Sequence, residues 1–279
     1  MSIIRNGLSK LKLFDVSMRD GLQSIQKVYT LPEKKEMLSN IMNQYRPKQM
    51  EIGSLISYNV LPQMKNSIEL YKYATSNKSC DFFLLVPPIK KFINEAELNN
   101  IKNISLITSV SNSFQEKNVK ITIDETKKLL DNFNSHTSKF TNIKLYVSCI
   151  TTCPLEGKKH NEYIIQELNY YSKLPFITNL CLADTCGNMK FTDFKYILDR
   201  VLKFMDVDKL SLHLHVNKDS LGDVHKIIDY AIKCKLYRFD VTSLENIGGC
   251  SVTMAKKNMH GNLSYNDLLD CIQKLTIIP

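Results

Sequence analysis

The sequence predicts an α/β protein with the (β/α)8 TIM-barrel fold, organised as a single domain over residues 1–279. Short apolar runs rich in β-branched and aromatic residues alternate with longer amphipathic segments along the chain. Eight such strand-then-helix units fit a chain of 279 residues, a size at which single barrels are common. An open doubly wound sheet is the alternative, but no predicted strand is followed by a GxGxxG or Walker-type loop.

The first unit is predicted as a strand over 11–16 and a helix over 32–45, in which Pro32 suits the first turn. The remaining strands are predicted, in chain order and with helical patterns between them, at 49–52, 82–86, 104–108, 144–150, 179–182, 209–215 and 238–242. Three helix starts combine a capping oxygen with an acid three residues later: Thr30 with Glu33, Ser220 with Asp223, and Ser264 with Asp267.

Composition narrows the class of protein. The hydrophobic fraction is 43% and the charged fraction 23%, and no apolar run approaches the roughly 20 residues that span a bilayer. The net charge of +9 comes from scattered lysines rather than a basic tract with interleaved aromatics, so we expect no membrane and no nucleic-acid partner. The lysine pairs at 90–91, 158–159 and 256–257 either bind phosphates or are solvated surface.

The cysteines and the termini predict a cytoplasmic protein. Cys149, Cys181 and Cys234 lie within apolar segments, as expected of reduced core residues rather than a disulfide framework. The first apolar segment follows the amino terminus closely, which leaves no room for a secretory signal, and the last three residues are not a peroxisomal signal. Cys149 and Cys153 have a spacing that suits zinc, but no second cysteine pair follows.

Two histidines in the predicted strand 209–215 indicate a metal site. His213 and His215 are two residues apart, so their side chains leave one face of a strand and can bind one divalent metal. Asp20 is the candidate oxygen ligand from the first unit. The structural alternative is two histidines that only hydrogen-bond to neighbouring strand ends.

Polar residues follow most of the predicted strands at their carboxyl ends, where a barrel places its chemistry. In strand order these are Arg19, Asp20 and Gln23 after the first strand, Glu51 at the second, Ser148 and Cys149 at the fifth, Asp184 and Thr185 at the sixth, the two histidines at the seventh, and Gly248, Gly249 and Cys250 after the eighth. Each also has a structural interpretation: Glu51 as an ion-pair partner of Arg19, and Asp184 as a helix cap.

The motifs occur in an order that resembles the DRE-TIM metallolyase superfamily, and within it the 3-hydroxy-3-methylglutaryl-CoA (HMG-CoA) lyase family. The resemblance covers most of the chain and rests on these segments: Arg19-Asp20-Gly21-Leu22-Gln23, Glu51-Ile52-Gly53-Ser54 with Pro62-Gln63-Met64, Tyr146-Val147-Ser148-Cys149 with Cys153-Pro154 and Glu156-Gly157-Lys158, Asp184-Thr185, His213-Leu214-His215, Gly248-Gly249-Cys250, and Gly261-Asn262-Leu263.

This resemblance implies a retro-Claisen cleavage of an acyl-CoA substrate into acetoacetate and acetyl-CoA, with Mg²⁺ or Mn²⁺ as the cofactor. It assigns the metal to Asp20, His213, His215 and Asn262, substrate contacts to Arg19 and Gln23, proton handling to His213, Asp184 and Cys250, and a supporting role to Glu51. In this scheme the metal acidifies the substrate hydroxyl and Arg19 neutralises the thioester oxygen. Because related lyases are often dimers, a homodimer is compatible with the resemblance.

Several positions depart from the lyase pattern. Val216, Asn217 and Lys218 replace an acidic run after His215, and Ser251 stands where a proline follows the loop cysteine. Three extra residues lie before Asn262, and Asn112 replaces an acid, which points to a shifted acyl specificity. Three functions therefore stay open in the sequence: an acyl-CoA lyase, a Claisen-type synthase of the same superfamily, and a catalytically silent barrel that only binds.

Overall fold

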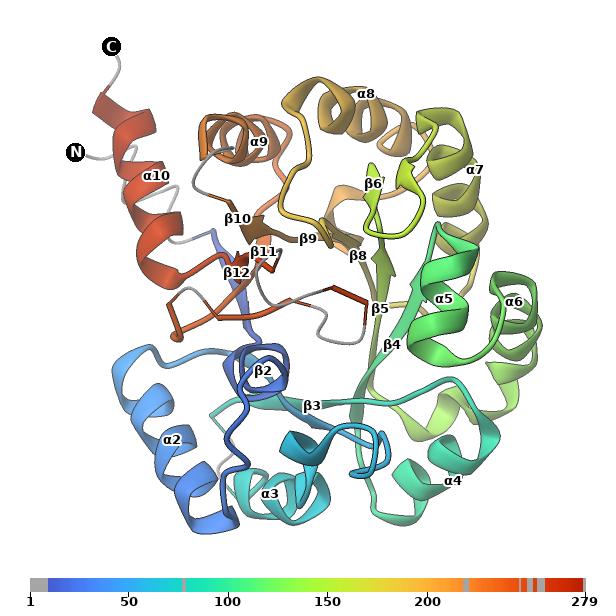
Figure 1. Ribbon diagram of the computed structural model, residues 1–279, viewed down its shortest axis with the longest axis vertical. Coiled ribbons are helices and arrows are strands. Elements are labelled where there is room, and N and C mark those ends of the chain that lie inside the picture. Colours follow the sequence, from blue (N-terminus) through green and yellow to red (C-terminus); the bar gives the residue numbers. More distant parts are fainter. Residues whose placement is uncertain are drawn as a thin grey trace.

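The computed structural model describes residues 10–76, 79–217, 221–245, 247–249, 253–254 and 259–277. Eight strands close into a barrel in the order β1-β11-β9-β8-β5-β4-β3-β2, and each neighbouring pair is parallel. The helices surround this barrel on its outside (Figure 1). The predicted (β/α)8 fold is confirmed, and the open-sheet alternative is wrong because β1 pairs with both β2 and β11.

The barrel strands are β1 (Lys12–Asp15), β2 (Gln49–Ser54), β3 (Asp81–Leu85), β4 (Asn103–Ser109), β5 (Asn142–Ser148), β8 (Asn179–Ala183), β9 (Leu210–His213) and β11 (Arg238–Val241). The strand predicted over 209–215 needs a correction. It ends at His213, and His215 begins a separate strand, β10 (His215–Val216), that pairs antiparallel with β12 (Gly261–Asn262). The reason is a hydrogen bond from the amide of Leu263 to the carbonyl of Leu214, which draws the chain toward β12.

The helices are α2 (Leu31–Gln44), α3 (Ser67–Ala74), α4 (Lys90–Leu98), α5 (Asn112–Val119), α6 (Ile123–Asp131), α7 (Asn161–Ser172), α8 (Phe191–Val201), α9 (Leu221–Lys233) and α10 (Tyr265–Ile277). Short helical turns are η1 (Ser17–Gly21), η2 (Pro62–Met64), η3 (Asn132–Lys139) and η4 (Val207–Lys209), and β6 (Thr152–Cys153) forms a hairpin with β7 (Gly157–Lys158). Two predicted helix starts are confirmed: Thr30 and Glu33 form a capping box, and the Ser264 hydroxyl accepts a hydrogen bond from the Asp267 amide. Ser220 lies outside the described residues.

The inside of the barrel is partly polar. Phe14 and Phe83 pack edge to face with ring centroids 5.0 Å apart. Beside them, Lys144 of β5 forms an ion pair with Asp240 of β11, and both side chains are almost completely buried. Because β5 and β11 are not neighbours in the sheet, this ion pair crosses the barrel interior. The Lys144 ammonium also lies 3.8 Å from the centre of the Phe14 ring, which adds a cation–π contact.

Among the described helices, none combines the length and the apolar character needed to cross a bilayer. Of the lysine pairs for which phosphate binding and solvated surface were both open, Lys158 and Lys159 form ion pairs with Asp193 and Glu156, respectively. The pair at 256–257 lies outside the described residues.

Candidate metal centre and active site

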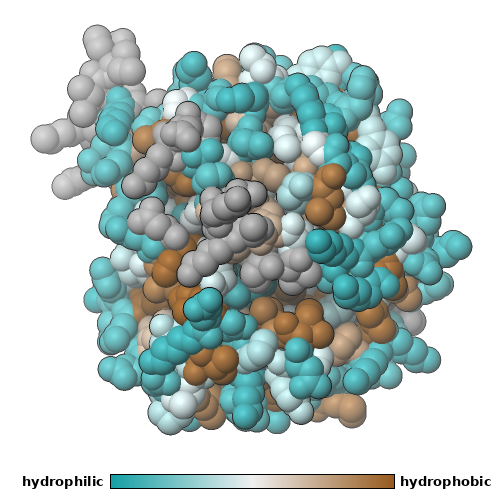
Figure 2. Space-filling model, viewed as in Figure 1, coloured by the Kyte–Doolittle hydropathy of each residue, from teal (hydrophilic) through white to brown (hydrophobic). Residues whose placement is uncertain are grey.

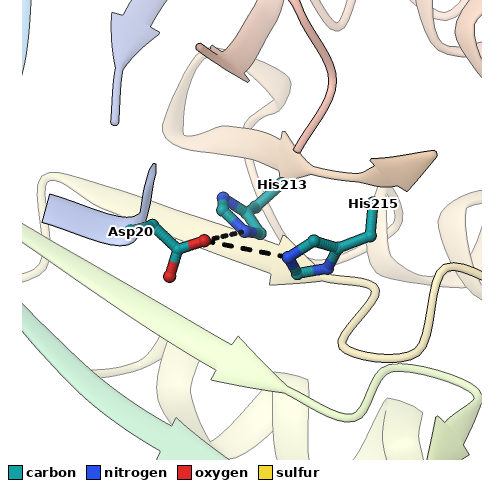
Figure 3. Close-up of side chains that lie close together, drawn as sticks. All are labelled: Asp20, His213 and His215. Atoms are coloured by element: carbon teal, nitrogen blue, oxygen red, sulfur yellow. Dashed lines mark ion pairs between the residues drawn. The ribbon is translucent and has the colours of Figure 1, made fainter. Parts of the chain in front are cut away.

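Asp20, His213 and His215 meet at the carboxyl ends of β1 and β9. The Asp20 Oδ2 atom lies 3.8 Å from Nε2 of His213 and 3.8 Å from Nε2 of His215. One ligand atom from each residue lies within 4.8 Å of the others, and all three residues are buried. The three side chains point toward one another (Figure 3). The predicted juxtaposition of these residues is therefore present.

The turn after β1 places Asp20 at this point. The Gly21 amide donates to the carbonyl of Val16 at 3.1 Å, five residues back, which makes η1 a single wide π-turn. Such turns often occur at functional sites, because the extra residue redirects the side chains around it. Here Arg19 and Asp20 are both buried, and the Arg19 guanidinium pairs with the Asp20 carboxylate.

Each imidazole is held by its Nδ1 atom, so that Nε2 faces Asp20. Nδ1 of His215 donates to the carbonyl of Asp184 at 2.6 Å, a contact that assigns the ring tautomer. Nδ1 of His213 lies 3.2 Å from Oδ2 of Asp240. A carbonyl or carboxylate behind a ligating histidine fixes the ring orientation and raises its basicity as a ligand.

Asn262 completes a donor set that fits a divalent cation. It lies directly opposite His215 in the β10–β12 pair, so the two side chains share one face of this ribbon. Both amide atoms of Asn262, and Nε2 of His215, are buried without a hydrogen-bond partner among the described residues. Buried polar atoms are normally paired, so these orphans indicate a ligand. One carboxylate, two imidazoles and one amide suit Mg²⁺ or Mn²⁺ better than a thiolate-rich zinc site.

Arg19 links this centre to Glu51 and Tyr146. Its Nε donates to Glu51, whose carboxylate also accepts a hydrogen bond from the Tyr146 hydroxyl at 3.3 Å. Burial by itself raises the pKa of Asp20, but Arg19, followed by His215 and His213, outweighs it and holds that pKa well below its usual value. Asp20 is therefore a carboxylate, the state that a metal ligand requires.

Asp184 and Glu51 lie behind the site rather than in it, since neither lines the adjoining cavity. The Asp184 carboxylate accepts a hydrogen bond from the Met189 amide at 3.1 Å, and its main-chain carbonyl holds His215. Burial raises the pKa of Asp184 in spite of that amide. Gln23, the other predicted substrate contact, does line the cavity.

Cys250, predicted to handle a proton, lies outside the described residues, but the two glycines before it are placed. Gly248 has φ +141°, and a Cβ atom there would lie 2.4 Å from the Asn262 amide nitrogen. Only glycine therefore allows this close approach. The Gly249 amide donates to the Asp20 carboxylate at 3.4 Å, so Gly249 itself lies beside a candidate metal ligand.

Sequence reasoning missed Lys144, Tyr146 and Asp240 as parts of the site. Lys144 and Asp240 are charged residues inside otherwise apolar strands, at positions where a buried barrel strand is normally apolar. A charged residue within an otherwise apolar strand was the sequence feature that could have identified Lys144 and Asp240. Tyr146 lay within a recognised motif, and its ring packs edge to face against His213, with centroids 5.8 Å apart.

A cavity of about 350 Å³ opens beside the triad. It is lined by Arg19, Asp20, His213 and His215 together with apolar residues and the two lysines Lys117 and Lys120. This volume lies in the range of small-molecule binding sites. Asn112, which suggested a shifted acyl specificity, does not line it. Its side chain joins α5 to α6 by accepting a hydrogen bond from the Ile123 amide at 3.0 Å.

Cys149 and Cys153 form a buried thiol pair rather than a zinc site. In the described part of the chain, only one group of three or more His, Cys, Asp or Glu residues is close enough to hold a metal. It consists of Asp20, His213 and His215 and contains neither cysteine. Cys153 accepts hydrogen bonds from the Ser111 hydroxyl at 3.0 Å and from the amides of Leu155 and Glu156. Because Ser111 also caps α5, this sulfur joins the β6–β7 hairpin to that helix.

We expect Cys153 to be a thiolate at neutral pH. A hydrogen bond with Cys149 lowers its pKa to about 5 against the effect of burial, with help from Ser111 and the two amides. Because the pKa of Cys153 is lowered in the folded protein, its thiolate stabilises the folded state. This contribution is fully present above the ordinary thiol pKa and is lost as the pH falls through about 5. The difference in thiolate ultraviolet absorbance between the wild type and Cys153→Ala reports the ionisation of Cys153. As the pH is varied, this difference should titrate with a midpoint near 5.

Cys80→Ala serves as the control, because burial raises the pKa of Cys80 to about 12 and its difference spectrum should be flat at neutral pH. A Cys153 midpoint near that of free cysteine would contradict the assignment.

Known proteins with similar sequences are lyases. Hydroxymethylglutaryl-CoA lyase of Macaca fascicularis is 25% identical over 269 residues, covering 96% of this chain and 80% of that protein. A 3-hydroxy-3-isohexenylglutaryl-CoA/hydroxymethylglutaryl-CoA lyase of Pseudomonas aeruginosa is 23% identical over 276 residues, covering 96% and 86%. These relatives confirm the predicted class of enzyme, a carbon–carbon lyase.

Solved structures agree with the fold. An HMG-CoA lyase from Acinetobacter baumannii, in complex with coenzyme A and 3-methylmalate, has a TM-score of 0.81 at 25% identity and covers 96% of this chain and 84% of that one. The P. aeruginosa hydroxymethylglutaryl-CoA lyase structure has a TM-score of 0.82 at 20% identity, covering 96% and 86%. The HMGL-like family profile matches residues 10–222, more than half of the chain, so the protein belongs to the HMGL-like family.

Proposed function

We propose that this protein is a divalent-metal-dependent lyase that cleaves HMG-CoA into acetoacetate and acetyl-CoA. The observation that carries the proposal is the buried group of Asp20, His213 and His215, with Arg19 beside it, at the wall of a cavity. The charges of Lys117 and Lys120 in the same cavity favour an anionic substrate such as an acyl-CoA. The similarity to a lyase that binds coenzyme A supports the same choice.

Asp20, His213, His215 and Asn262 would hold Mg²⁺ or Mn²⁺, which supplies Lewis-acid stabilisation of negative charge on substrate oxygens. In the retro-Claisen reaction the C3 hydroxyl loses its proton, the C2–C3 bond breaks to leave a ketone, and C2 gains a proton. Arg19 lines the cavity as a permanent cation, so it would stabilise the enolate oxygen of the departing acetyl-CoA.

The other predicted residues divide into contact and positioning roles. Gln23 lines the cavity and would contact the acyl group, whereas Glu51 holds Arg19. Asp184 would position His215 through its carbonyl. We retain His213 and Cys250 as the proposed proton carriers, since His213 lines the cavity and Gly249 brings the loop before Cys250 to Asp20.

The test is incubation of the purified protein with HMG-CoA and Mn²⁺, with acetoacetate and acetyl-CoA measured separately. Equal amounts of the two products, lost on chelation and restored by Mn²⁺ or Mg²⁺, are the expected result. If calorimetry detects Mn²⁺ binding but neither product forms, the lyase proposal fails. Release of free CoA from acetyl-CoA and a 2-oxo acid would then indicate the synthase alternative.

A further inference from the structure

We propose that the cavity beside the metal centre receives an aliphatic substituent larger than methyl on the hydroxyl-bearing carbon of the substrate. The preferred substrates are then 3-hydroxy-3-alkylglutaryl-CoA thioesters, of which HMG-CoA is the smallest homologue. This inference rests on the proposed lyase function, because it assumes that the reacting carbon lies at Asp20, His213 and His215.

The apolar part of the cavity is formed by three consecutive units of the barrel. Each unit contributes at least two apolar side chains, among them Ile56 and Val60 after β2, Leu85 and Ile89 around the end of β3, and Ile107 and Phe114 from β4 and α5. Strands β2, β3 and β4 are neighbours in the sheet. The apolar residues therefore form one continuous wall, and on the surface apolar residues also gather over β3, below the centre of Figure 2.

The candidate metal ligands come from other parts of the barrel. Asp20 follows β1, while His213 and His215 belong to β9 and β10. A substrate oxygen bound at these residues therefore places the carbon that bears it between the polar groups and the apolar wall. A methyl group at that carbon would contact only a small part of the wall, whereas a longer alkyl chain would contact more of it.

The wall suits an alkyl chain better than the pantetheine arm of coenzyme A. Pantetheine carries two amides, and an amide buried without hydrogen-bond partners is strongly disfavoured. The six side chains named above offer neither donors nor acceptors, although Ser54, Ser57 and Asn118 line the same cavity. Apolar cavities of this kind favour hydrocarbon over water.

The segment that carries Ile56 and Val60 is fixed in place from behind. Lys34 of α2 is buried, and its ammonium donates to the carbonyl of Gln63 at 2.7 Å and of Lys65 at 2.6 Å. The side-chain amide of Gln63 (Nε2) donates to the carbonyl of Ile25 at 2.6 Å. Such a preformed wall costs little ordering on binding, so the alkyl contacts contribute to specificity. The P. aeruginosa relative whose name includes an isohexenyl substrate is consistent with this class.

The first test compares HMG-CoA with its 3-propyl and 3-butyl homologues, with acetyl-CoA, the product common to all three, as the readout. Burial of each added methylene should raise kcat/KM by about fourfold, which amounts to about 60-fold for butyl over methyl. If HMG-CoA is cleaved at least as efficiently as the butyl homologue, the inference fails while the lyase function stands.

The second test fills the cavity with Val60→Phe and uses Val28→Phe as the matched control. Both valines are exposed, at 55% and 44%, so neither change should unfold the protein, and Val28 does not line the cavity. Val60→Phe should reduce the ratio of kcat/KM for the butyl over the methyl substrate to about one, whereas Val28→Phe should keep the wild-type ratio. A Val60→Phe protein that keeps the wild-type ratio would overturn the inference.

Calorimetry with the free acids tests the preference for a longer alkyl substituent even if the protein does not turn over the thioesters. In the presence of Mn²⁺, 3-hydroxy-3-butylglutarate should bind the wild type at least about tenfold more tightly than 3-hydroxy-3-methylglutarate, and Val60→Phe should remove this difference. If Val60→Phe instead weakens binding of free coenzyme A and leaves both acids unaffected, the wall holds pantetheine and the inference is wrong. Failure of all three thioesters to react would count against the lyase function alone.

Discussion

The Asp20→Asn variant is expected to lose divalent-cation binding and at least about 10³-fold in kcat/KM for HMG-CoA. Asp20 would be the one anionic ligand in the group with His213 and His215, and its carboxylate is kept ionised chiefly by Arg19. Asparagine preserves the shape of the side chain but leaves neutral groups around a double positive charge. A metal ion contributes several kcal/mol of charge stabilisation, and each 1.36 kcal/mol corresponds to about tenfold in rate.

Two measurements separate the metal from the chemistry in this variant. Calorimetric titration with Mn²⁺ should show at least about a 100-fold weaker affinity, a larger loss than that expected for a residue behind a ligand. Asp208→Asn is the control, because Asp208 is a largely exposed carboxylate that pairs with Lys12 on the surface. An Asp20→Asn protein with Mn²⁺ affinity close to that of the wild type would remove Asp20 from the ligand set.

The sequence was sufficient to predict which residues meet at the candidate metal centre, because a parallel barrel brings the carboxyl ends of its strands to one face. Asp20 and His213 lie far apart in the chain, yet each follows or ends a strand that periodicity alone could locate. The spacing of His213 and His215 was informative for a partly different reason. His215 is not on the barrel strand but begins the ribbon with β12, which also brings Asn262 to the site.

What the sequence did not reveal depends on the closure of the barrel. The partners Lys144 and Asp240 are contributed by strands that become opposite one another only when all eight strands are in order. The sequence also did not reveal the direction in which the polar side chains at the strand ends point. Asp184 follows a strand as predicted, but its carboxylate turns to the Met189 amide. Asn112 is hydrogen-bonded to the start of α6 and does not line the cavity, whereas Phe114 of the same helix does.

The buried Lys144–Asp240 ion pair should be important for the stability of the barrel. Both side chains are at most 3% exposed, so Asp240→Leu would leave the Lys144 charge buried without its partner. Breaking a buried pair from one side costs about 3–5 kcal/mol of unfolding free energy. Lys144→Met with Asp240 intact should be destabilising for the same reason, since it leaves the carboxylate uncompensated. Urea unfolding of the two single variants measures both losses.

The double variant Lys144→Met/Asp240→Leu separates stability from function. Replacing a buried ion pair by apolar residues of similar size is often neutral, so its unfolding free energy should return to within about 1 kcal/mol of the wild type. His213 nevertheless loses the carboxylate 3.2 Å from its Nδ1 atom, and Mn²⁺ affinity should stay about 10–100-fold reduced. Recovery of both properties would mean that Asp240 does not position His213. Recovery of neither would mean that the interior tolerates no apolar replacement. The expected split, a stable barrel with a weakened metal centre, follows from one carboxylate serving both the ion pair and the imidazole.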